Sequence, residues 1–302
     1  MSSLSFRTSR YILVATDPVH IGTGGNRLGR VDLSIAREPG TRLPKIPGTS
    51  LSGALRHYAA FRAGRRQCAG KTSPCGDEKC PICYTFGTAN DAGGGYRGVV
   101  SIGDARILLF PVYSMYGPVW VTSPATLQDW GAAVVPAPEG EEIALTTAEL
   151  SAKGHLNLGW LLLPTRTWPQ PPTLPPEIPS EVAKRVVVID DMLFSQVVNS
   201  NLEVRTSVSI DPETGAAEDG ALFTYEAIPR ATYLWTEIIE DDFRGRFPAD
   251  APKVFNPHRW GSPLEVVEAG FEWMAALGVG GMSTRGFGRV RCLSCGNQEA
   301  AA

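Results

Sequence analysis

The spacing of apolar and polar residues predicts a chain of short β-strands with an amphipathic helix near each end. In residues 6–16, FRTSRYILVAT, side chains alternate with the two-residue period of a strand. In residues 263–277, PLEVVEAGFEWMAAL, apolar side chains recur every three or four residues, which is the period of a helix. Strands are expected at residues 6–16, 30–36, 99–113, 118–122, 202–210 and 221–226, and helices at residues 50–64 and 263–277.

Three further segments separate or connect these elements. Residues 67–98 are rich in cysteine and glycine, and residues 164–179 contain seven prolines, which predicts a stiff extended loop. The turn sequence Asp211-Pro-Glu-Thr-Gly215 predicts a projecting hairpin over about residues 204–226. A β-α-β pattern near each end then favours an α+β fold, with a ferredoxin-like (RRM-like) sheet and large insertions.

Composition limits the class of protein without deciding its function. The chain has 302 residues, 43% of them apolar, so one large domain or two ordinary domains can form a substantial core. No run of about 18 apolar residues is present, and therefore we expect no membrane span. The first residues, MSSLSFRTSRYILVATD, lack the apolar core and cleavage site of a signal peptide. These features predict a cytoplasmic protein.

Charge is divided unevenly along the chain, although the net charge is only −3. Residues 1–66 contain eleven Lys and Arg against three Asp and Glu, a net charge of +8, and the remainder carries −11. This asymmetry favours one basic face suited to a polyanion and one acidic face. Opposite faces of this kind would also let like subunits attract one another head to tail.

Two glycine-containing segments have the composition of phosphate-binding loops. Residues 278–288 contain five glycines, and Arg285 and Arg289 add guanidinium groups that can bind phosphate together with backbone N–H groups. This segment is neither a P-loop nor a dinucleotide fingerprint, because no Gly-Lys-Ser/Thr follows and the helix precedes the glycines. The arginines favour phosphate binding over a merely flexible turn.

The second segment, Lys45-Ile-Pro-Gly-Thr-Ser50, leads into the expected helix at residues 50–64. Thr49 or Ser50 can cap this helix, and the free N–H groups of its first turn can bind phosphate with help from Lys45. Taken alone, an ordinary capped helix is the simpler interpretation.

Asp32 is a lone acid that follows Arg27 and Arg30 in the sequence. A carboxylate in this setting can bind a divalent metal or orient a ribose 2′-hydroxyl for attack on the adjacent phosphate. Its ordinary pKa of about 3.9 makes it a poor base at neutral pH unless a metal or a pKa shift assists. From the residues alone, a surface Asp paired with an arginine is the favoured interpretation.

Cysteine spacing predicts a metal site. The first four cysteines follow C-x6-C-x4-C-x2-C, which in a cytosolic chain favours zinc over disulfides. Cys292 and Cys295 are expected to be free thiols. His20 lies beside a Gly-rich loop and could approach Asp32, but a packing role is favoured. The candidate zinc ligands are Cys68, Cys75, Cys80 and Cys83.

Eight stretches, taken together and in this order, carry a family resemblance. They are HIGTGG, GRVDLSIARE, IPGTSLSGALR, CPICYTFGTAND, IGDARILLFPV, WVTSP, RTSVSIDPETGAAEDGALFTYE and GVGGMSTRGFGRVR. They span most of the chain, which resembles the CRISPR-associated RAMP superfamily, and most closely the repeated backbone subunit of the type III-B (Cmr) effector complex.

The resemblance implies a single RAMP domain over residues 1–302, with an RRM-like palm and a thumb hairpin at about residues 204–226. Residues 67–98 and 164–179 would be insertions. Such subunits stack along a guide RNA as a helical filament, and their thumbs open the guide–target duplex at regular intervals. In the family an Asp after the Gly-rich turn cuts target RNA at each wedge with a divalent metal, and this residue maps onto Asp32.

A catalytic role for Asp32, with Mg²⁺ or another divalent cation, is therefore favoured once the resemblance is considered. Arg30 is a candidate stabiliser of phosphate charge. The family's guide-contacting loop maps onto residues 45–56, where Ser52 stands in place of an expected lysine, so Lys45 or Arg56 is expected to supply that charge. The implied RNA-binding residues are Arg30, Lys45, Thr49, Ser50, Arg56, Gly280, Gly281, Arg285, Gly286 and Arg289.

The implied partners are guide RNA, target RNA, further copies of this chain and other subunits of the effector complex, with no membrane. Three other functions stay open at this point. The chain could be a filament subunit without catalysis, in which Asp32 is structural. It could be a stand-alone RAMP endonuclease that processes guide precursor, for which His20 is the candidate to test. It could also be a zinc-dependent assembly scaffold.

Overall fold

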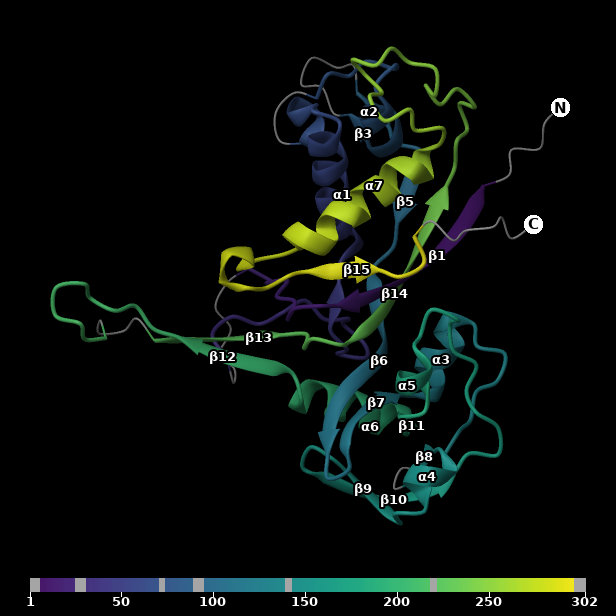
Figure 1. Ribbon diagram of the computed structural model, residues 1–302, viewed down its shortest axis with the longest axis vertical. Coiled ribbons are helices and arrows are strands. Elements are labelled where there is room, and N and C mark those ends of the chain that lie inside the picture. Colours follow the sequence, from purple (N-terminus) through teal and green to yellow (C-terminus); the bar gives the residue numbers. More distant parts are fainter. Residues whose placement is uncertain are drawn as a thin grey trace.

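The computed structural model describes residues 6–24, 31–70, 74–88, 95–138, 143–217 and 222–295. It is an α+β structure built on one large mixed sheet that runs along the molecule (Figure 1). Its helices are α1 (Gly48–Arg62), α2 (Pro81–Phe86), α3 (Pro124–Trp130), α4 (Ala148–Ser151), α5 (Ser180–Ala183), α6 (Asp191–Ser200) and α7 (Pro263–Leu277), with 3-10 turns η1 (Arg66–Ala69) and η2 (Ser283–Arg285).

The large sheet has the strand order β15-β1-β14-β6-β7-β11-β8-β10-β9, with β2 beside β6 and β5 beside β14. Its strands are β1 (Arg7–Ala15), β2 (Lys45–Ile46), β5 (Val100–Ile102), β6 (Ala105–Ser114), β7 (Gly117–Thr122), β8 (Ala144–Thr146), β9 (His155–Leu158), β10 (Leu161–Thr167), β11 (Val186–Val188), β14 (Tyr233–Glu240) and β15 (Val290–Cys292). Two small sheets pair β3 (Gly87–Thr88) with β4 (Tyr96–Arg97), and β12 (Glu203–Ser207) with β13 (Phe223–Ala227).

One half of the molecule combines both ends of the chain. In it β15, β1, β14 and β6 pair antiparallel, and α1 and α7 pack together above them (Figure 1). The two helices cross closely at Gly270, where an added Cβ would lie 2.5 Å from the carbonyl oxygen of Leu55. Phe271 and Met274 of α7 are buried with Leu51 and Leu55 of α1 in the same core.

The central strand β1 is buried on both faces. Tyr11 and Leu13 belong to the core that includes α1 and α7. Ile12 and Val14 belong to a second core on the opposite face, which includes Leu127 of α3. A strand covered on both faces can carry apolar residues at consecutive positions, which accounts for the run YILVA in the sequence.

The other half of the molecule is formed by residues 115–202, which follow β6 in the chain and precede the hairpin (Figure 1). It extends the large sheet through β7, β11, β8, β10 and β9 and adds the short helices α3 to α6. The predicted proline-rich loop lies here and is not helical, although residues 164–167 belong to β10.

A two-stranded hairpin, β12–β13, projects from the side of the molecule (Figure 1). Its strands pair from Glu203 with Ala227 to Ser207 with Phe223, and Ile210 with Ala217 forms a further bridge toward the tip. The predicted hairpin over residues 204–226 is therefore present, with each strand shifted slightly. Exposed Val204 and Val208 lie along it.

Other expected elements are largely confirmed, with some corrections. The strand expected at residues 99–113 is divided into β5 and β6, with Gly103 and Asp104 between them. Residues 31–37 are not a continuous strand, because Leu33, Ile35 and Arg37 each form an isolated bridge to a different segment. Cys292 and Cys295 are disulfide-bonded, so the prediction of free thiols was wrong. No helix in the described ranges is long and apolar enough to cross a membrane.

The helix expected at residues 50–64 begins earlier, at Gly48, and neither Thr49 nor Ser50 caps it. The carboxylate of Asp104 accepts a hydrogen bond from the Gly48 N–H at 2.7 Å instead. The cap therefore comes from a residue distant in sequence, which local helix signals cannot predict.

Candidate functional site

Asp32 lies beside the base of the hairpin, because the segment that carries it runs along β13. The Leu33 N–H donates to the carbonyl oxygen of Thr224 at 3.0 Å, and the Glu226 N–H donates to the Leu33 carbonyl oxygen at 3.2 Å. Leu33 and Tyr225 form a parallel bridge between these bonds. The candidate catalytic segment is thus held to the hairpin by backbone hydrogen bonds.

Thr224 binds the Asp32 carboxylate with two donors. Its backbone N–H lies 2.7 Å and its hydroxyl 2.9 Å from Oδ2 of Asp32. The backbone hydrogen bond and then the hydroxyl hydrogen bond lower the pKa of this exposed Asp32 below its ordinary value, since both stabilise the charged form. Asp32 is therefore a fixed negative charge at neutral pH, and its affinity for a proton is too low for efficient general base catalysis.

A mostly buried ion pair orders the rest of this segment. Arg37 makes a two-pronged contact with Glu226, with nitrogen–oxygen distances of 2.5 and 2.8 Å. The side chains of Arg37 and Glu226 are only 16% and 9% exposed. Glu226 also accepts a hydrogen bond from the Ile35 N–H at 2.8 Å. One carboxylate thus fixes two points of the segment that follows Asp32.

The glycine-rich loop at residues 278–288 reaches the same region. Gly280 has a φ of +90°, and an added Cβ would lie 2.4 Å from the carbonyl oxygen of His20. The Gly281 N–H donates to that same oxygen at 2.9 Å. Phe287, at the end of the loop, is buried against Tyr225 of β13 with ring centroids 5.5 Å apart. The loop and the hairpin base therefore pack as one unit.

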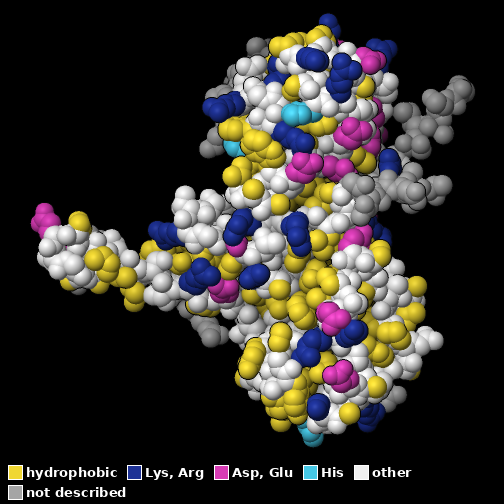
Figure 2. All heavy atoms as spheres, in the orientation of Figure 1, with side chains coloured by type: hydrophobic (Ala, Val, Ile, Leu, Met, Phe, Trp, Pro, Cys, Tyr) yellow, Lys and Arg dark blue, Asp and Glu magenta, His cyan; other side chains and the backbone are white. Residues whose placement is uncertain are grey.

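Two arginines cover the aromatic side chains of this unit. The guanidinium carbon of Arg205 lies 4.6 Å from the ring centre of Phe287, and that of Arg285 lies 5.5 Å from the ring centre of Phe223. Both arginines are exposed. Figure 2 shows Lys and Arg side chains gathered around the base of the projecting hairpin and an acidic group at its tip. The hairpin base therefore presents positive charge and aromatic surface close to the Asp32 segment.

His20 is buried, with 5% of its surface exposed. Its Nδ1 lies 2.7 Å from the carbonyl oxygen of Glu226, and its ring meets Tyr225 edge-on. A packing role for His20 agrees with these contacts. Its backbone and ring connect the glycine-rich loop to β13.

The second predicted phosphate-binding segment, residues 45–50, includes β2 and the start of α1. Lys45 forms an ion pair with Asp104, whose other oxygen accepts the hydrogen bond from the N-terminus of α1. Burial alone would raise the pKa of Asp104, but the hydrogen bonds from Lys45 and Gly48 outweigh it, and the pKa is lowered. A carboxylate therefore already occupies the anion position at this helix end. Phosphate binding by Lys45, Thr49 and Ser50 stays a prediction.

Other predicted RNA contacts also make internal interactions. Arg56 donates from Nε to the Cys68 carbonyl oxygen at 2.8 Å, and Arg289 forms a two-pronged ion pair with Asp17. Gly286 follows η2 in a left-handed conformation with φ +78°. Arg30 lies outside the described residues.

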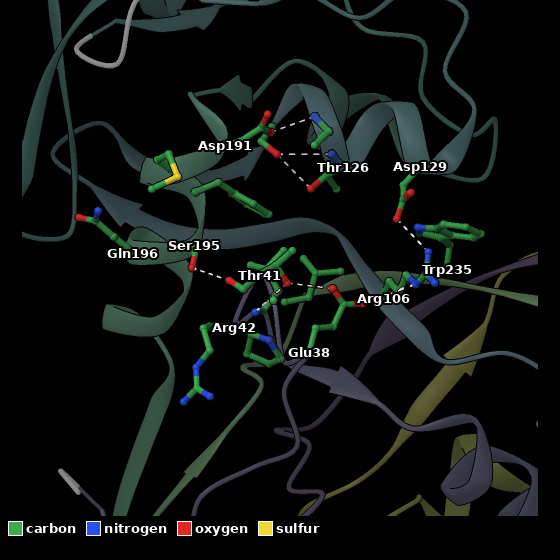
Figure 3. A pocket seen from close by; sticks show the side chains of 18 residues that line it. Glu38, Thr41, Arg42, Arg106, Thr126, Asp129, Asp191, Ser195, Gln196 and Trp235 are labelled. Atoms are coloured by element: carbon green, nitrogen blue, oxygen red, sulfur yellow. Dashed lines mark hydrogen bonds and ion pairs between the residues drawn. The ribbon is translucent and has the colours of Figure 1, made fainter.

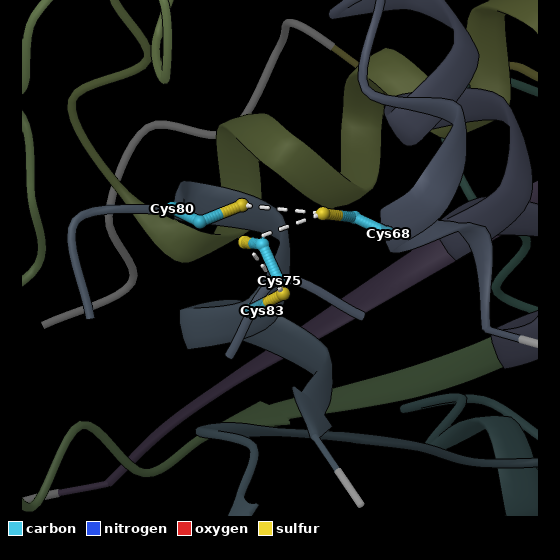
Figure 4. A group of neighbouring side chains, drawn as sticks. All are labelled: Cys68, Cys75, Cys80 and Cys83. Atoms are coloured by element: carbon cyan, nitrogen blue, oxygen red, sulfur yellow. Dashed lines mark hydrogen bonds between the residues drawn. The ribbon is translucent and has the colours of Figure 1, made fainter. Parts of the chain in front are cut away.

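The four cysteines of the insertion converge, as their spacing predicted. Their sulfur atoms all lie within 4.8 Å of one another (Figure 4). Three are buried and Cys75 is partly exposed. Among the described parts of the chain, this is the only group of three or more His, Cys, Asp or Glu side chains placed to hold a metal ion.

A cavity lies between the loop at residues 38–44, α3, α6 and Trp235 (Figure 3). Its volume is about 620 Å³. Arg106, Glu38 and Asp129 line it, and Arg106 forms ion pairs with both carboxylates. None of the predicted catalytic or RNA-binding side chains is among its described lining residues.

The contacts that hold the Asp32 segment and the hairpin base together were not predicted from the sequence. Thr224, Glu226, Arg205 and Phe287 lie between 173 and 255 positions from Asp32 in the chain, in two of the stretches that carry the family resemblance. One signal was available, since Thr224 and Glu226 lie in the alternating stretch that predicted the hairpin. That alternating pattern indicates a strand, but it does not indicate which segment of the chain lies beside the strand.

Replacing Thr224 with valine should weaken the hold on Asp32. Valine keeps the shape and the backbone donor but removes the hydroxyl donor, so the pKa of Asp32 should rise toward its ordinary value of about 3.9. Any activity that needs ionised Asp32 is lost as pH falls through this pKa, so its acid limit should move to higher pH. Displacement of Asp32 should also slow the reaction at neutral pH, by up to about 10²-fold.

The measurement is the pH dependence of the RNA cleavage that the family resemblance implies, for the wild-type chain, Thr224→Val and Thr224→Ser. Serine keeps the hydroxyl, so its profile should follow that of the wild type. Equal acid limits in all three proteins would contradict the role of the hydroxyl.

Comparisons with known proteins agree on one family. A model of the RAMP superfamily matches residues 12–291. The chain is similar to the CRISPR system Cmr endoribonuclease Cmr4 of Pyrococcus furiosus, with 29% identity over 249 residues that cover 75% of this chain and 79% of the relative. It is also similar to the CRISPR system Cms endoribonuclease Csm3 of Methanothermobacter thermautotrophicus, with 38% identity over 86 residues that cover 28% and 31% of the two chains.

Solved structures share the fold at lower sequence identity. A chain in the cryo-EM structure of the apo state of type III-B Cmr-beta superimposes with a TM-score of 0.66 at 16% identity, covering 95% of this chain and 96% of the other. A chain of Cmr-beta bound to cognate target RNA gives 0.64 at 15% identity, covering 95% and 97%. Oligomeric Cmr4 from Pyrococcus furiosus gives 0.59 at 21% identity, covering 96% and 98%.

Proposed function

This chain belongs to the RAMP superfamily, and on that premise we propose that it is a repeated backbone subunit of a type III CRISPR effector complex. It binds guide RNA, stacks with further copies of itself along that RNA and cleaves complementary target RNA at regular intervals. The observation that carries this proposal is the exposed Asp32 carboxylate, which Thr224 holds at the base of a protruding hairpin.

The arrangement of elements supports a ferredoxin-like palm with a thumb. The order β15-β1-β14-β6 with antiparallel pairing, and the connection of β1 to β6 through α1 and of β14 to β15 through α7, match a split β-α-β arrangement. The hairpin β12–β13 is the proposed thumb. The chain is then one domain, in which residues 67–98 and 164–179 are insertions.

Two relatives support the proposed partners by their descriptions. One similar structure contains cognate target RNA, and another is an oligomeric Cmr4. In this chain, the glycine-rich loop supplies exposed backbone at Gly280, Gly281 and Gly286 and a positive charge at Arg285. Arg205 on the hairpin adds a second exposed guanidinium beside it. Cation and aromatic groups in this combination suit a phosphate backbone with unstacked bases.

The proposed reaction is attack of a ribose 2′-oxygen on the adjacent phosphorus, which forms the O2′–P bond and breaks the P–O5′ bond. The hydroxyl proton passes to water and the departing O5′ takes a proton from water, leaving a 2′,3′-cyclic phosphate and a 5′-hydroxyl. The hairpin wedges the duplex open and splays one nucleotide, so that the hydroxyl can align with the bond to be broken. Asp32, held ionised by Thr224, orients the hydroxyl or a cation at this point. Arg30 is the proposed partner of the phosphate charge.

Asp32 is exposed, and both described hydrogen bonds to its carboxylate come from Thr224 and are made to Oδ2. A protein site for Mg²⁺ often has only one or two carboxylates, with substrate phosphate completing the coordination. Asp32 therefore fits a cation shared with RNA and does not fit a site made by protein alone. A bound cation would neutralise phosphate charge during the attack.

Stepwise assembly is the first test. Light scattering on the chain mixed with guide-like RNAs of increasing length should show bound copies rising in steps with RNA length. Because phosphate contacts release counterions, affinity should fall steeply with salt. A fixed complex of one or two copies at every length would contradict the filament and favour a stand-alone endonuclease. In that case His20→Ala should abolish processing of guide precursor.

A further inference from the structure

Four cysteine side chains of the insertion at residues 67–98 lie close together. Cys68 lies in η1, Cys75 follows in a loop, Cys80 precedes α2 and Cys83 lies in the first turn of α2 (Figure 4). They converge from three separate pieces of backbone.

The sulfur–sulfur distances are those of a metal tetrahedron. Cys68 lies 3.5 Å from Cys75 and 3.8 Å from Cys80, and Cys75 lies 3.7 Å from Cys83. Four thiolates around zinc, each about 2.3 Å from the ion, lie about 3.8 Å from one another. A disulfide requires about 2.05 Å between sulfurs, and Cys292–Cys295 shows that bond in this same structure.

The positive charges around the cluster point to an anionic group. Arg65 directly precedes η1, the turn that contains Cys68, and Arg56 donates to the Cys68 carbonyl oxygen at 2.8 Å. Nη2 of Arg56 and Nε of Arg65 are buried without a hydrogen-bond partner. If the four thiols were neutral, no negative charge in the cluster would balance the positive charge of these two guanidinium groups. Four thiolates around one Zn²⁺ carry a net charge of −2, which these arginines can balance.

We propose that Cys68, Cys75, Cys80 and Cys83 bind one structural zinc ion that fastens the insertion onto α1 and α7. All four positions of the metal are taken by protein, so the ion has no open position for water or substrate and does not take part in cleavage. The cluster packs on Ala59 of α1 and on Val266 and Ala269 of α7, so the ion stabilises the join between the insertion and both helices. This inference goes beyond the proposed function and does not depend on RNA.

Metal content of the purified wild-type chain tests the proposal directly. After a wash with chelator to remove loosely bound ions, elemental analysis should find about one zinc per chain. A chain refolded with Co²⁺ should show the strong thiolate-to-cobalt absorption and tetrahedral bands of a four-sulfur site. A chain without bound metal, or one in which alkylation without reduction shows disulfides among these cysteines, would overturn the proposal.

Two matched variants separate the site from the other cysteines. Cys80→Ser/Cys83→Ser should lose the zinc, whereas Cys292→Ser/Cys295→Ser should keep about one zinc per chain. If the first variant does not fold, metal content and the cobalt spectrum of the wild type still decide the question. A chain that holds zinc but does not bind guide RNA would contradict the proposed function and leave this inference intact.

Discussion

Replacing Asp32 with alanine should abolish cleavage of target RNA while binding of guide and target continues. Asp32 is exposed, and its two described side-chain contacts are both with Thr224. Its loss therefore removes charge at the proposed scissile phosphate without opening a cavity. Because Asp32 is a poor proton acceptor, it acts through its charge and its position. Removing one preorganised polar group of this kind costs about 10²–10³-fold in rate, and we expect a loss of that size. The measurement is the single-turnover cleavage rate in the assembled complex.

Two further variants make this result specific. Asp32→Asn keeps an acceptor for Thr224 but removes the charge, so it should be nearly as inactive as Asp32→Ala. Asp250→Ala removes another exposed carboxylate that lies in the loop before α7, and it should cleave at the wild-type rate. Unchanged cleavage in Asp32→Ala would leave a filament subunit without catalysis as the better explanation.

Replacing Glu226 with alanine should produce the largest loss of stability among changes near the site. Glu226 is 7% exposed and binds both Arg37 and the Ile35 N–H. Its removal leaves a mostly buried guanidinium without its carboxylate, and this costs about 3 kcal/mol in the free energy of unfolding. The urea midpoint should fall with little change in the slope of the transition.

Companion variants identify the source of that cost. Glu226→Gln keeps the buried stem and a neutral acceptor for the Ile35 N–H but removes the charge, so the difference between it and the wild type measures what the charge contributes. In the double variant Arg37→Met/Glu226→Leu both charges are gone, so it should be more stable than Glu226→Ala. Additive effects of the two single changes would show that Arg37 and Glu226 are not coupled.

These two predictions concern one structural connection. The segment from Asp32 to Arg37 is held to β13 by Thr224 at one end and by Glu226 at the other. A shift of the hairpin would therefore carry Asp32 with it. If the hairpin is the wedge that opens the duplex, the group that cuts is attached to the group that splays the nucleotide. Glu226→Ala should then also slow cleavage in the fraction of protein that stays folded.

Local sequence determined most of the elements. The apolar periodicity predicted β1, α1 and α7 to within a few residues, and turn residues predicted the hairpin. The spacing of Cys68, Cys75, Cys80 and Cys83 predicted that these side chains meet, because their loops are short and bring the sulfurs back to one place. Such features depend on neighbours within a few positions, so the chain alone contains the information.

Tertiary structure decided which distant residues share a site. The strand expected at residues 30–36 became a set of isolated bridges, because the side chain of Glu226 takes the N–H of Ile35 that a sheet partner would have used. Asp104 caps α1 from 56 positions away, and Thr224 binds Asp32 from 192 positions away. Each contact pairs groups whose separation in the chain is unrelated to their separation in space. Strand order and packing therefore decided which residues surround Asp32. The sequence alone identified Asp32 as the candidate reactive acid.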